Sequence, residues 1–229
     1  MPKFNLTAKY QPSPAQAESI ARLEAGLAEG RQDQTLVGVT GSGKTYVMAN
    51  IIARENKPAL VLAHNKTLAA QLYAEFKAFF PDNAVKYFIS YYDFYQPEAY
   101  IPQRDLYIEK ESEVNKTIEK YRNAATQALL TRPDTIIIAS VSCIYCLGDP
   151  DDYMAISRKV EKGMHYNREK LLRHLSDMQY ERITSDFTNG TFRVRGDNVE
   201  LYLASADEAV RIEYFGDEIE AIKLINPLT

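Results

Sequence analysis

A single octapeptide at residues 38–45 constrains the fold of this chain more than any other feature. It reads Gly-Val-Thr-Gly-Ser-Gly-Lys-Thr; a short apolar run at residues 35–40 leads into it, and helical apolar spacing over residues 46–54 follows. A strand, a glycine loop and a helix in this order predict a phosphate-binding P-loop. The glycines let backbone N–H groups turn inward, and the helix N-terminus adds partial positive charge. A plain glycine turn before a helix is the alternative, but it leaves the match of every fixed motif position unexplained.

Each side chain of this loop has an expected role. Lys44 reaches the β- and γ-phosphates of a nucleoside triphosphate, and the Thr45 hydroxyl binds Mg²⁺. The loop residues expected to bind ATP are Gly38, Val39, Thr40, Gly41, Ser42, Gly43, Lys44 and Thr45.

Two further apolar runs, at residues 59–63 and 135–139, predict buried central strands of a parallel sheet. Helical spacing lies between them in two segments, at Leu68, Leu72, Phe76 and Phe79 and at Val114, Ile118, Tyr121, Ala125 and Leu129. Strands that alternate with helices predict an α/β fold with a doubly wound sheet.

Polar residues follow both predicted strands. Ligands of such sheets bind beyond the carboxyl ends of the strands, which would place residues 64–67 and 140–143 on a functional rim. Thr67 and Ser140 are also good helix caps, so ordinary capping explains these segments equally well.

The chain lacks one part that nucleotide hydrolysis needs. Hydrolysis requires a second carboxylate that holds Mg²⁺ and places water, and usually an arginine that stabilises the transition state. No run of four apolar residues precedes an Asp-Glu pair; residues 215–218 come nearest, but their glycine indicates a hairpin turn. We therefore expect this chain to bind nucleotide weakly and to hydrolyse it negligibly by itself.

Residues 90–102 concentrate aromatic side chains in a segment that does not suit a core. Pro97 and Pro102 break helices and central strands, and Asp93, Gln96 and Glu98 resist burial. The aromatic rings either stack on nucleic-acid bases, at about 1–3 kcal/mol per base, or pack on their own protein at a loop tip.

Charge limits the kind of nucleic-acid binding that is possible. The formal net charge of −4 excludes a generally basic, sequence-blind binder, so a DNA contact must be local. No apolar run is long enough for a membrane span, and residues 1–4 lack the apolar core of a signal peptide. The expected compartment is the cytoplasm.

Cys143 and Cys146 form an isolated Cys-x-x-Cys pair. A structural zinc site needs two more ligands, and the three histidines show no paired spacing. We expect two reduced structural thiols; metal binding or redox chemistry is the alternative.

The pattern changes after about residue 150, from continuous apolar runs to alternation. Strands are predicted at residues 191–195, 199–203, 210–214 and 218–225, after an amphipathic helix near 168–178. Such an antiparallel sheet has one buried and one charged face. The charged face carries Arg193, Arg195 and Arg211, which either bind a partner or are simply solvated.

These motifs together resemble the amino-terminal part of the UvrB family, the damage-recognition subunits of bacterial nucleotide excision repair. The resemblance covers the chain essentially from end to end. Its most specific motifs lie at residues 38–45, 63–71, 90–100, 107–110, 139–145 and 190–197.

The resemblance implies a superfamily 2 helicase-like P-loop domain at residues 1–152 and a smaller α+β domain at 153–229 that binds UvrA. A β-hairpin at about 91–114 is implied to pass between DNA strands. Its implied DNA-binding residues are Tyr91, Tyr92, Phe94, Tyr95, Tyr100 and Tyr107. The implied UvrA-binding residues are Arg182, Arg193, Arg195, Arg211 and Glu213, and Gln16 is implied to recognise adenine.

Several positions depart from the family pattern. Phe94 replaces a tyrosine, Cys146 a glycine and Asn189 a basic residue, and residues 14–17 differ from the usual Gly-Asp-Gln-Pro. These changes put in doubt one hydroxyl of the hairpin, part of adenine recognition and part of the UvrA contact. The acidic motif, the arginine finger and the second motor domain of the family are not found in these residues.

The implied function is ATP-dependent recognition and verification of DNA damage, with DNA received from UvrA and a pre-incision complex formed with UvrC. The implied cofactors are ATP and Mg²⁺. The alternative is a non-enzymatic adaptor that docks on UvrA without ATP hydrolysis. An unrelated P-loop kinase is a third possibility, which the aromatic segment disfavours.

Overall fold

The computed structural model describes residues 3–90, 92–96, 99–101, 106–108, 111–114, 116–144 and 149–226. The chain forms two compact units, which we describe separately. The first unit contains Met1–Ser90 and Thr131–Ile144, and the second contains Tyr91–Leu130 and Tyr145–Thr229. The domain boundary expected after residue 152 stays a prediction.

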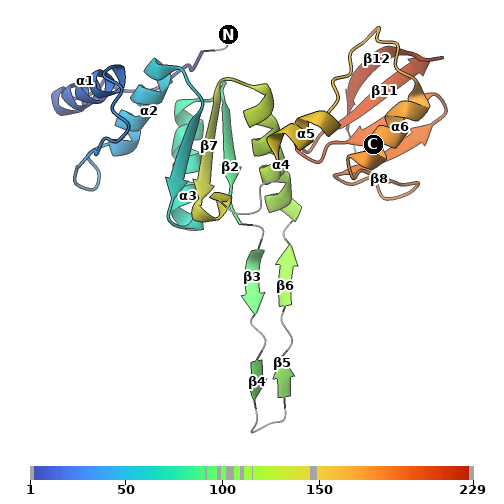
Figure 1. The fold of residues 1–229 in the computed structure, drawn as a ribbon, viewed down its shortest axis with the longest axis horizontal. Helices are drawn as coiled ribbons and strands as arrows, with labels where there is room; N and C mark the ends of the chain where they lie inside the picture. The colour runs from blue at the N-terminus through green and yellow to red at the C-terminus, as the bar shows by residue number, and fades with distance from the viewer. Residues whose placement is uncertain are drawn as a thin grey trace. The chain divides into compact units, whose positions relative to one another are not determined.

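A parallel sheet is the centre of the first unit (Figure 1). Its strand order is β1 (Ala59–Ala63), β7 (Thr135–Ser140) and β2 (Ala84–Phe88), and β7 pairs with both neighbours in parallel. Every residue of β7 is buried, as its apolar run predicted. The predicted α/β class with a parallel sheet is therefore confirmed.

Two details of this sheet differ from the prediction. Strand β1 lies at an edge of the described sheet rather than at its centre, and its Leu60 and Leu62 are 59% and 57% exposed. The run at residues 35–40 is not a strand: within the described chain it joins no ladder, and Val37 is 87% exposed. An apolar run indicates burial, but only a hydrogen-bonded neighbour makes it a strand.

Three helices belong to the first unit: α1 (Pro14–Ala28), α2 (Lys44–Glu55) and α3 (Lys66–Phe79). Helix α3 packs against β2 and β7, and its Phe76 is fully buried beside Phe80, with ring centroids 6.3 Å apart. Asn65 caps α3 by accepting a hydrogen bond from the Leu68 N–H. Capping of this helix was one of the two alternatives for residues 64–67, but the cap is Asn65 and not Thr67. A short 3₁₀ helix, η2 (Val141–Ile144), follows β7.

The second unit begins with two successive antiparallel pairs, which agree with the expected hairpin (Figure 1). Strand β3 (Tyr92–Gln96) pairs with β6 (Glu111–Val114), and β4 (Ala99–Ile101) pairs with β5 (Leu106–Ile108). Helix α4 (Lys116–Thr131) follows. Val114, which the helical spacing had included, belongs to β6 instead.

A five-stranded sheet closes the second unit. Its order is β12 (Glu218–Ile225), β11 (Ala209–Phe215), β10 (Asn198–Tyr202), β9 (Thr191–Arg195) and β8 (Glu181–Arg182). All pairs are antiparallel except β8 with β9. The four predicted strands and the hairpin turn at residues 215–218 are confirmed; β8 was not predicted.

Helix α6 (Arg168–Asp177) covers one face of this sheet, after the short α5 (Pro150–Ile156). The core between α6 and the sheet consists of Leu171, Leu172, Leu175, Phe192, Val199, Ile212, Tyr214 and Ile219. Among the described residues, none of the helices combines the length and the apolar character that a bilayer crossing requires.

Candidate functional site

The glycine loop ends where α2 begins, as a phosphate site requires. Gly41 and Gly43 both have φ of +82°, a left-handed conformation that a side chain disfavours, and Gly43 is the N-cap of α2. No side chain caps the helix there. The first N–H groups of a helix have no intrahelical partner, and they point toward the loop together with the positive end of the helix dipole. The geometry suits an anion.

Lys44, the first residue of α2, lies against its own loop. Its Nζ donates hydrogen bonds to the carbonyl oxygens of Gly38 at 2.7 Å and Val39 at 2.9 Å. A Cβ at Gly38 would come within 2.7 Å of Ser42 Oγ, so the loop is closed tightly at this point. Lys44 and the half-buried Thr45 occupy adjacent positions in the first turn of α2, where phosphate and Mg²⁺ ligands are needed.

Gln16 contacts the same loop from α1. Its Nε2 donates to the Ser42 carbonyl oxygen at 2.9 Å, and its Oε1 accepts from the Ser13 N–H at 3.0 Å as part of a capping box. The Gln16 amide also approaches Gly43 so closely that a Cβ there would collide with it. The structure thus brings Gln16 and the loop residues together, as expected for one nucleotide site.

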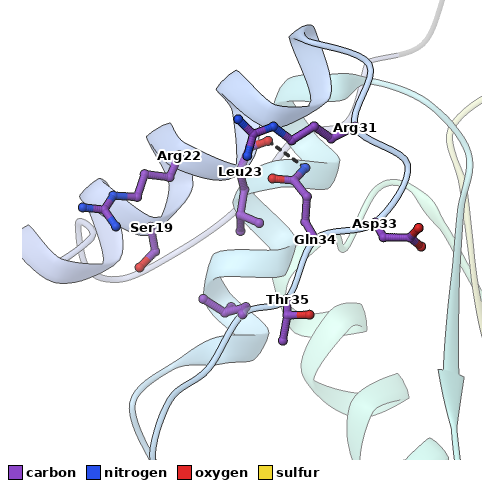
Figure 2. Close-up of a pocket in the computed structure, with 8 residues that line it drawn as sticks. Ser19, Arg22, Leu23, Arg31, Asp33, Gln34 and Thr35 are labelled. Atoms are coloured by element: carbon purple, nitrogen blue, oxygen red, sulfur yellow. Dashed lines mark hydrogen bonds between the residues drawn. The ribbon is translucent and has the colours of Figure 1, made fainter.

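A separate pocket lies beside α1, before the loop (Figure 2). Its volume is about 440 Å³, and Gln34 crosses one side by donating a hydrogen bond to the Leu23 carbonyl at 3.1 Å. Its two arginines, Arg22 and Arg31, pair with Glu18 and Glu29. The residues predicted to bind nucleotide lie outside its lining, which is Ser19, Arg22, Leu23, Arg31, Asp33, Gln34, Thr35 and Leu36.

The aromatic residues predicted to bind DNA lie on the paired strands of the second unit. Tyr92, Phe94 and Tyr95 belong to β3, where Tyr95 is opposite Ser112. Tyr100 in β4 is directly opposite Tyr107 in β5. Tyr91 lies outside the described residues. Five of the six predicted residues thus lie on the two antiparallel pairs, β3 with β6 and β4 with β5.

The residues predicted to bind UvrA occupy three strands of the five-stranded sheet. Arg182 lies in β8, Arg193 and Arg195 in β9, and Arg211 and Glu213 in β11. Arg182 and Arg195 are exposed. Glu213 pairs with Lys223 of β12, whose Nζ lies 2.7 Å from its Oε2.

Arg193 and Arg211 are joined through a carboxylate that the sequence analysis did not assign to the site. Glu200 of β10 is 1% exposed; its Oε2 accepts from Arg193 Nε at 2.5 Å and its Oε1 from Arg211 Nη2 at 2.7 Å. Burial raises the pKa of Glu200, but the hydrogen bonds and charges of the two arginines outweigh burial and hold it below its usual value. Alternation in the sequence places Glu200 only on the charged face of its strand, and the register then sets it opposite both arginines.

Part of the loop before β9 covers this face of the sheet. The Phe187 ring lies over the Arg193 guanidinium at 4.3 Å and packs against Tyr202. Asn189, expected to weaken a partner contact, donates through Nδ2 to the carbonyl oxygens of Leu203 and Ala206. The charged face is therefore not uniformly solvated.

Each of the two rim segments contains a residue with a clear structural role. Asn65 caps α3, and Ser140 is the buried last residue of β7. Cys143 is a buried free thiol in η2. Cys146 lies outside the described residues. The described part of the chain contains no cluster of His, Cys, Asp or Glu side chains with metal-ligand geometry.

Two family comparisons match the two halves of the chain. Residues 9–139 match the family described as "Type III restriction enzyme, res subunit", and residues 159–229 match the "UvrB interaction domain". The chain is 53% identical to the UvrABC system protein B of Dehalococcoides mccartyi over 229 residues, all of this chain and 34% of that protein.

The chain belongs to the UvrB family. It is 56% identical to the UvrABC system protein B of Geobacillus kaustophilus and of Bacillus subtilis, over 99% of this chain and 35% and 34% of those proteins. The chain thus spans about a third of the length of these relatives. The resemblance of the P-loop region and of the second sheet to UvrB, expected from the motifs, is confirmed.

Proposed function

We propose that this chain binds ATP with Mg²⁺ and recognises DNA damage in nucleotide excision repair, receiving DNA from UvrA. One observation carries the proposal: a P-loop on α2 and a UvrB interaction domain occur in the same chain. A nucleotide site alone is common to many proteins, but here it occurs in one chain with a match to the UvrB interaction domain at residues 159–229.

The first unit supplies the nucleotide site. The N–H groups of the loop and Lys44 hold the phosphates, Gln16 contacts the base, and Thr45 holds Mg²⁺ through its hydroxyl. When bound, Mg²⁺ neutralises charge on the phosphates. With nucleotide bound, the Lys44 ammonium would donate to phosphate oxygens in place of the Gly38 and Val39 carbonyls. This exchange couples nucleotide binding to a change in the loop.

The second unit supplies the DNA and protein contacts. The aromatic residues of the two antiparallel pairs stack on bases near the lesion, which suits a chain whose net charge of −4 disfavours binding through phosphates alone. The five-stranded sheet docks on UvrA through Arg182, Arg195, Arg211 and Glu213, with Arg193 behind them. The incision complex then forms with UvrC in the cytoplasm.

A gel-shift experiment tests this assignment. UvrA is bound to a duplex with one bulky lesion and a photoreactive base beside it, and this chain is added. We expect a slower UvrA–DNA–chain complex, which Arg195→Glu abolishes and which Tyr95→Ala retains while losing the photo-crosslink to the chain. A Lys57→Ala variant, altered at an exposed lysine, is the control. Equal crosslinks on damaged and undamaged duplexes would refute damage recognition.

A further inference from the structure

Glu200 is enclosed between two arginines of neighbouring strands. The register pairs it with Arg193 of β9 and with Arg211 of β11, so all three side chains project from the same face. Arg193 donates through Nε to one carboxylate oxygen, and Arg211 donates through Nε and Nη2 to the other. A buried carboxylate with this many charge-assisted hydrogen bonds holds its donors in fixed positions.

The two arginines are not equivalent. The Arg193 side chain is 15% exposed, and the Phe187 ring covers its guanidinium. The Arg211 side chain is 37% exposed. A guanidinium has five N–H donors, and only two from Arg211 reach Glu200. Arg193 is therefore the more enclosed of the two, while the partly exposed Arg211 guanidinium has three N–H donors that Glu200 does not use.

We infer that Glu200, held by Arg193, positions Arg211 to bind a carboxylate on the partner protein. The inference rests on the proposed role of this sheet in docking UvrA. A fixed guanidinium edge matches a carboxylate in a bidentate geometry, and holding it before contact reduces the side-chain freedom lost on binding. Glu200 is thus a positioning residue that does not itself touch the partner.

Charge favours a carboxylate of a protein over a DNA phosphate. Arg193 and Arg211 share the single negative charge of Glu200, and the adjacent Lys223 is paired with Glu213. Binding to a phosphate backbone is driven by several unpaired cations acting together. One oriented guanidinium beside paired charges instead gives specificity for a single acidic group.

A double-mutant cycle tests the inference. The affinity of the 229-residue chain for UvrA is measured for Glu200→Gln, Arg211→Ala and the double variant. We expect each single variant to bind about 10-fold more weakly, and the double variant to bind no more weakly than Arg211→Ala. Glu220→Gln, which removes an exposed carboxylate from β12, should bind normally. Additive losses of UvrA affinity in the double variant, or unchanged affinity in Glu200→Gln, overturn the inference. If the variants lose affinity for DNA and not for UvrA, the claim that Arg211 binds a carboxylate of the partner protein is wrong.

A second measurement starts from the wild-type chain alone, without a partner. In the ¹H–¹⁵N spectrum of the wild-type chain, the Nε–H signals of Arg193 and Arg211 should exchange slowly with water, whereas those of Arg182 and Arg195 should exchange rapidly. In Glu200→Gln both slow signals should shift, and in Glu220→Gln neither. Rapid exchange at Arg211 contradicts the inference alone. Slow exchange in a chain that fails to bind UvrA supports the positioning role and contradicts the proposed docking function.

Discussion

The side chain of Gln16 joins the first turn of α1 to the P-loop by donating a hydrogen bond from Nε2 to the Ser42 carbonyl oxygen, 2.9 Å away. The same side chain completes the capping box of α1 with Ser13. One residue therefore fixes the helix start and the loop together. A change at Gln16 should alter nucleotide binding even though the loop sequence is intact.

Gln16→Ala should weaken binding of a fluorescent ATP analogue by about 2- to 10-fold, since a hydrogen bond contributes about 0.5–1.5 kcal/mol. Fluorescence titration with Mg²⁺ present measures this change. Gln32→Ala removes an exposed side-chain amide from the same unit and should bind the analogue as tightly as the wild type. If all three chains bound the ATP analogue with equal affinity, Gln16 would not contribute to nucleotide binding.

Lys44→Ala should reduce nucleotide affinity more strongly, by about 10- to 100-fold, because hydrogen bonds to charged groups contribute about 1.5–3 kcal/mol. Its stability should change little, since the Gly38 and Val39 carbonyls that lose the ammonium are exposed and can bind water. The same titration and a thermal melt measure both effects. A large drop in melting temperature would instead make Lys44 a structural residue of the loop.

ATP hydrolysis by the purified chain should be negligible with or without DNA and UvrA. The sequence contains no acidic pair at a strand end that would hold Mg²⁺ and orient water. A coupled phosphate-release assay measures turnover, and the Lys44→Ala chain sets the background. Steady-state turnover above that background would mean that a different carboxylate completes the site.

Asp134 should make the free energy of unfolding of the first unit depend on pH in the acidic range. Hydrogen bonds from Arg132 lower the pKa of Asp134 from 3.8 to about 2, against the opposing effect of burial, and Asn83 contributes a further hydrogen bond. The depressed pKa stabilises the fold above pH 3.8, by about 2 kcal/mol, and this contribution is lost as the pH falls toward 2. Urea unfolding of Asp134→Asn should therefore show the deficit at pH 7 and little deficit near pH 2.

Asp82→Asn is the matched control for this prediction. It removes an exposed carboxyl group from the segment before β2, where the Asp82 backbone carbonyl, and not its side chain, accepts a hydrogen bond from Arg132. Its unfolding curve should follow the wild type across the whole pH range. A deficit of Asp134→Asn that is equally large at pH 7 and pH 2 would mean that its cause is packing and not charge.

Sequence reasoning was most successful where one local pattern determines the structure. The glycines and Lys44 identify the loop at the start of α2, and alternation at residues 191–195 and 210–214 identifies β9 and β11. It failed for residues 35–40, because strand formation depends on a neighbour that the local sequence does not contain. The same limit applies to the site, because the contacts of its side chains also depend on which strands pair.

Glu200 shows this second limit most clearly. Alone it is one polar residue on an alternating strand, and only the register of β9, β10 and β11 makes it the common partner of two arginines. The cap of α3 is a smaller example, since both Asn65 and Thr67 have suitable side chains and only the backbone geometry selects Asn65. The sequence predicts which residue types take part, whereas register decides which of them meet.

The most direct test of the account is a calorimetric titration of UvrA into the wild-type, Lys44→Ala and Arg195→Glu chains. The account predicts a saturable isotherm for the wild type, the same isotherm for Lys44→Ala, and at least about a 10-fold loss of affinity for Arg195→Glu, whose exposed guanidinium lies on the docking face. Absence of binding by the folded wild-type chain, or equal binding by Arg195→Glu, would contradict it.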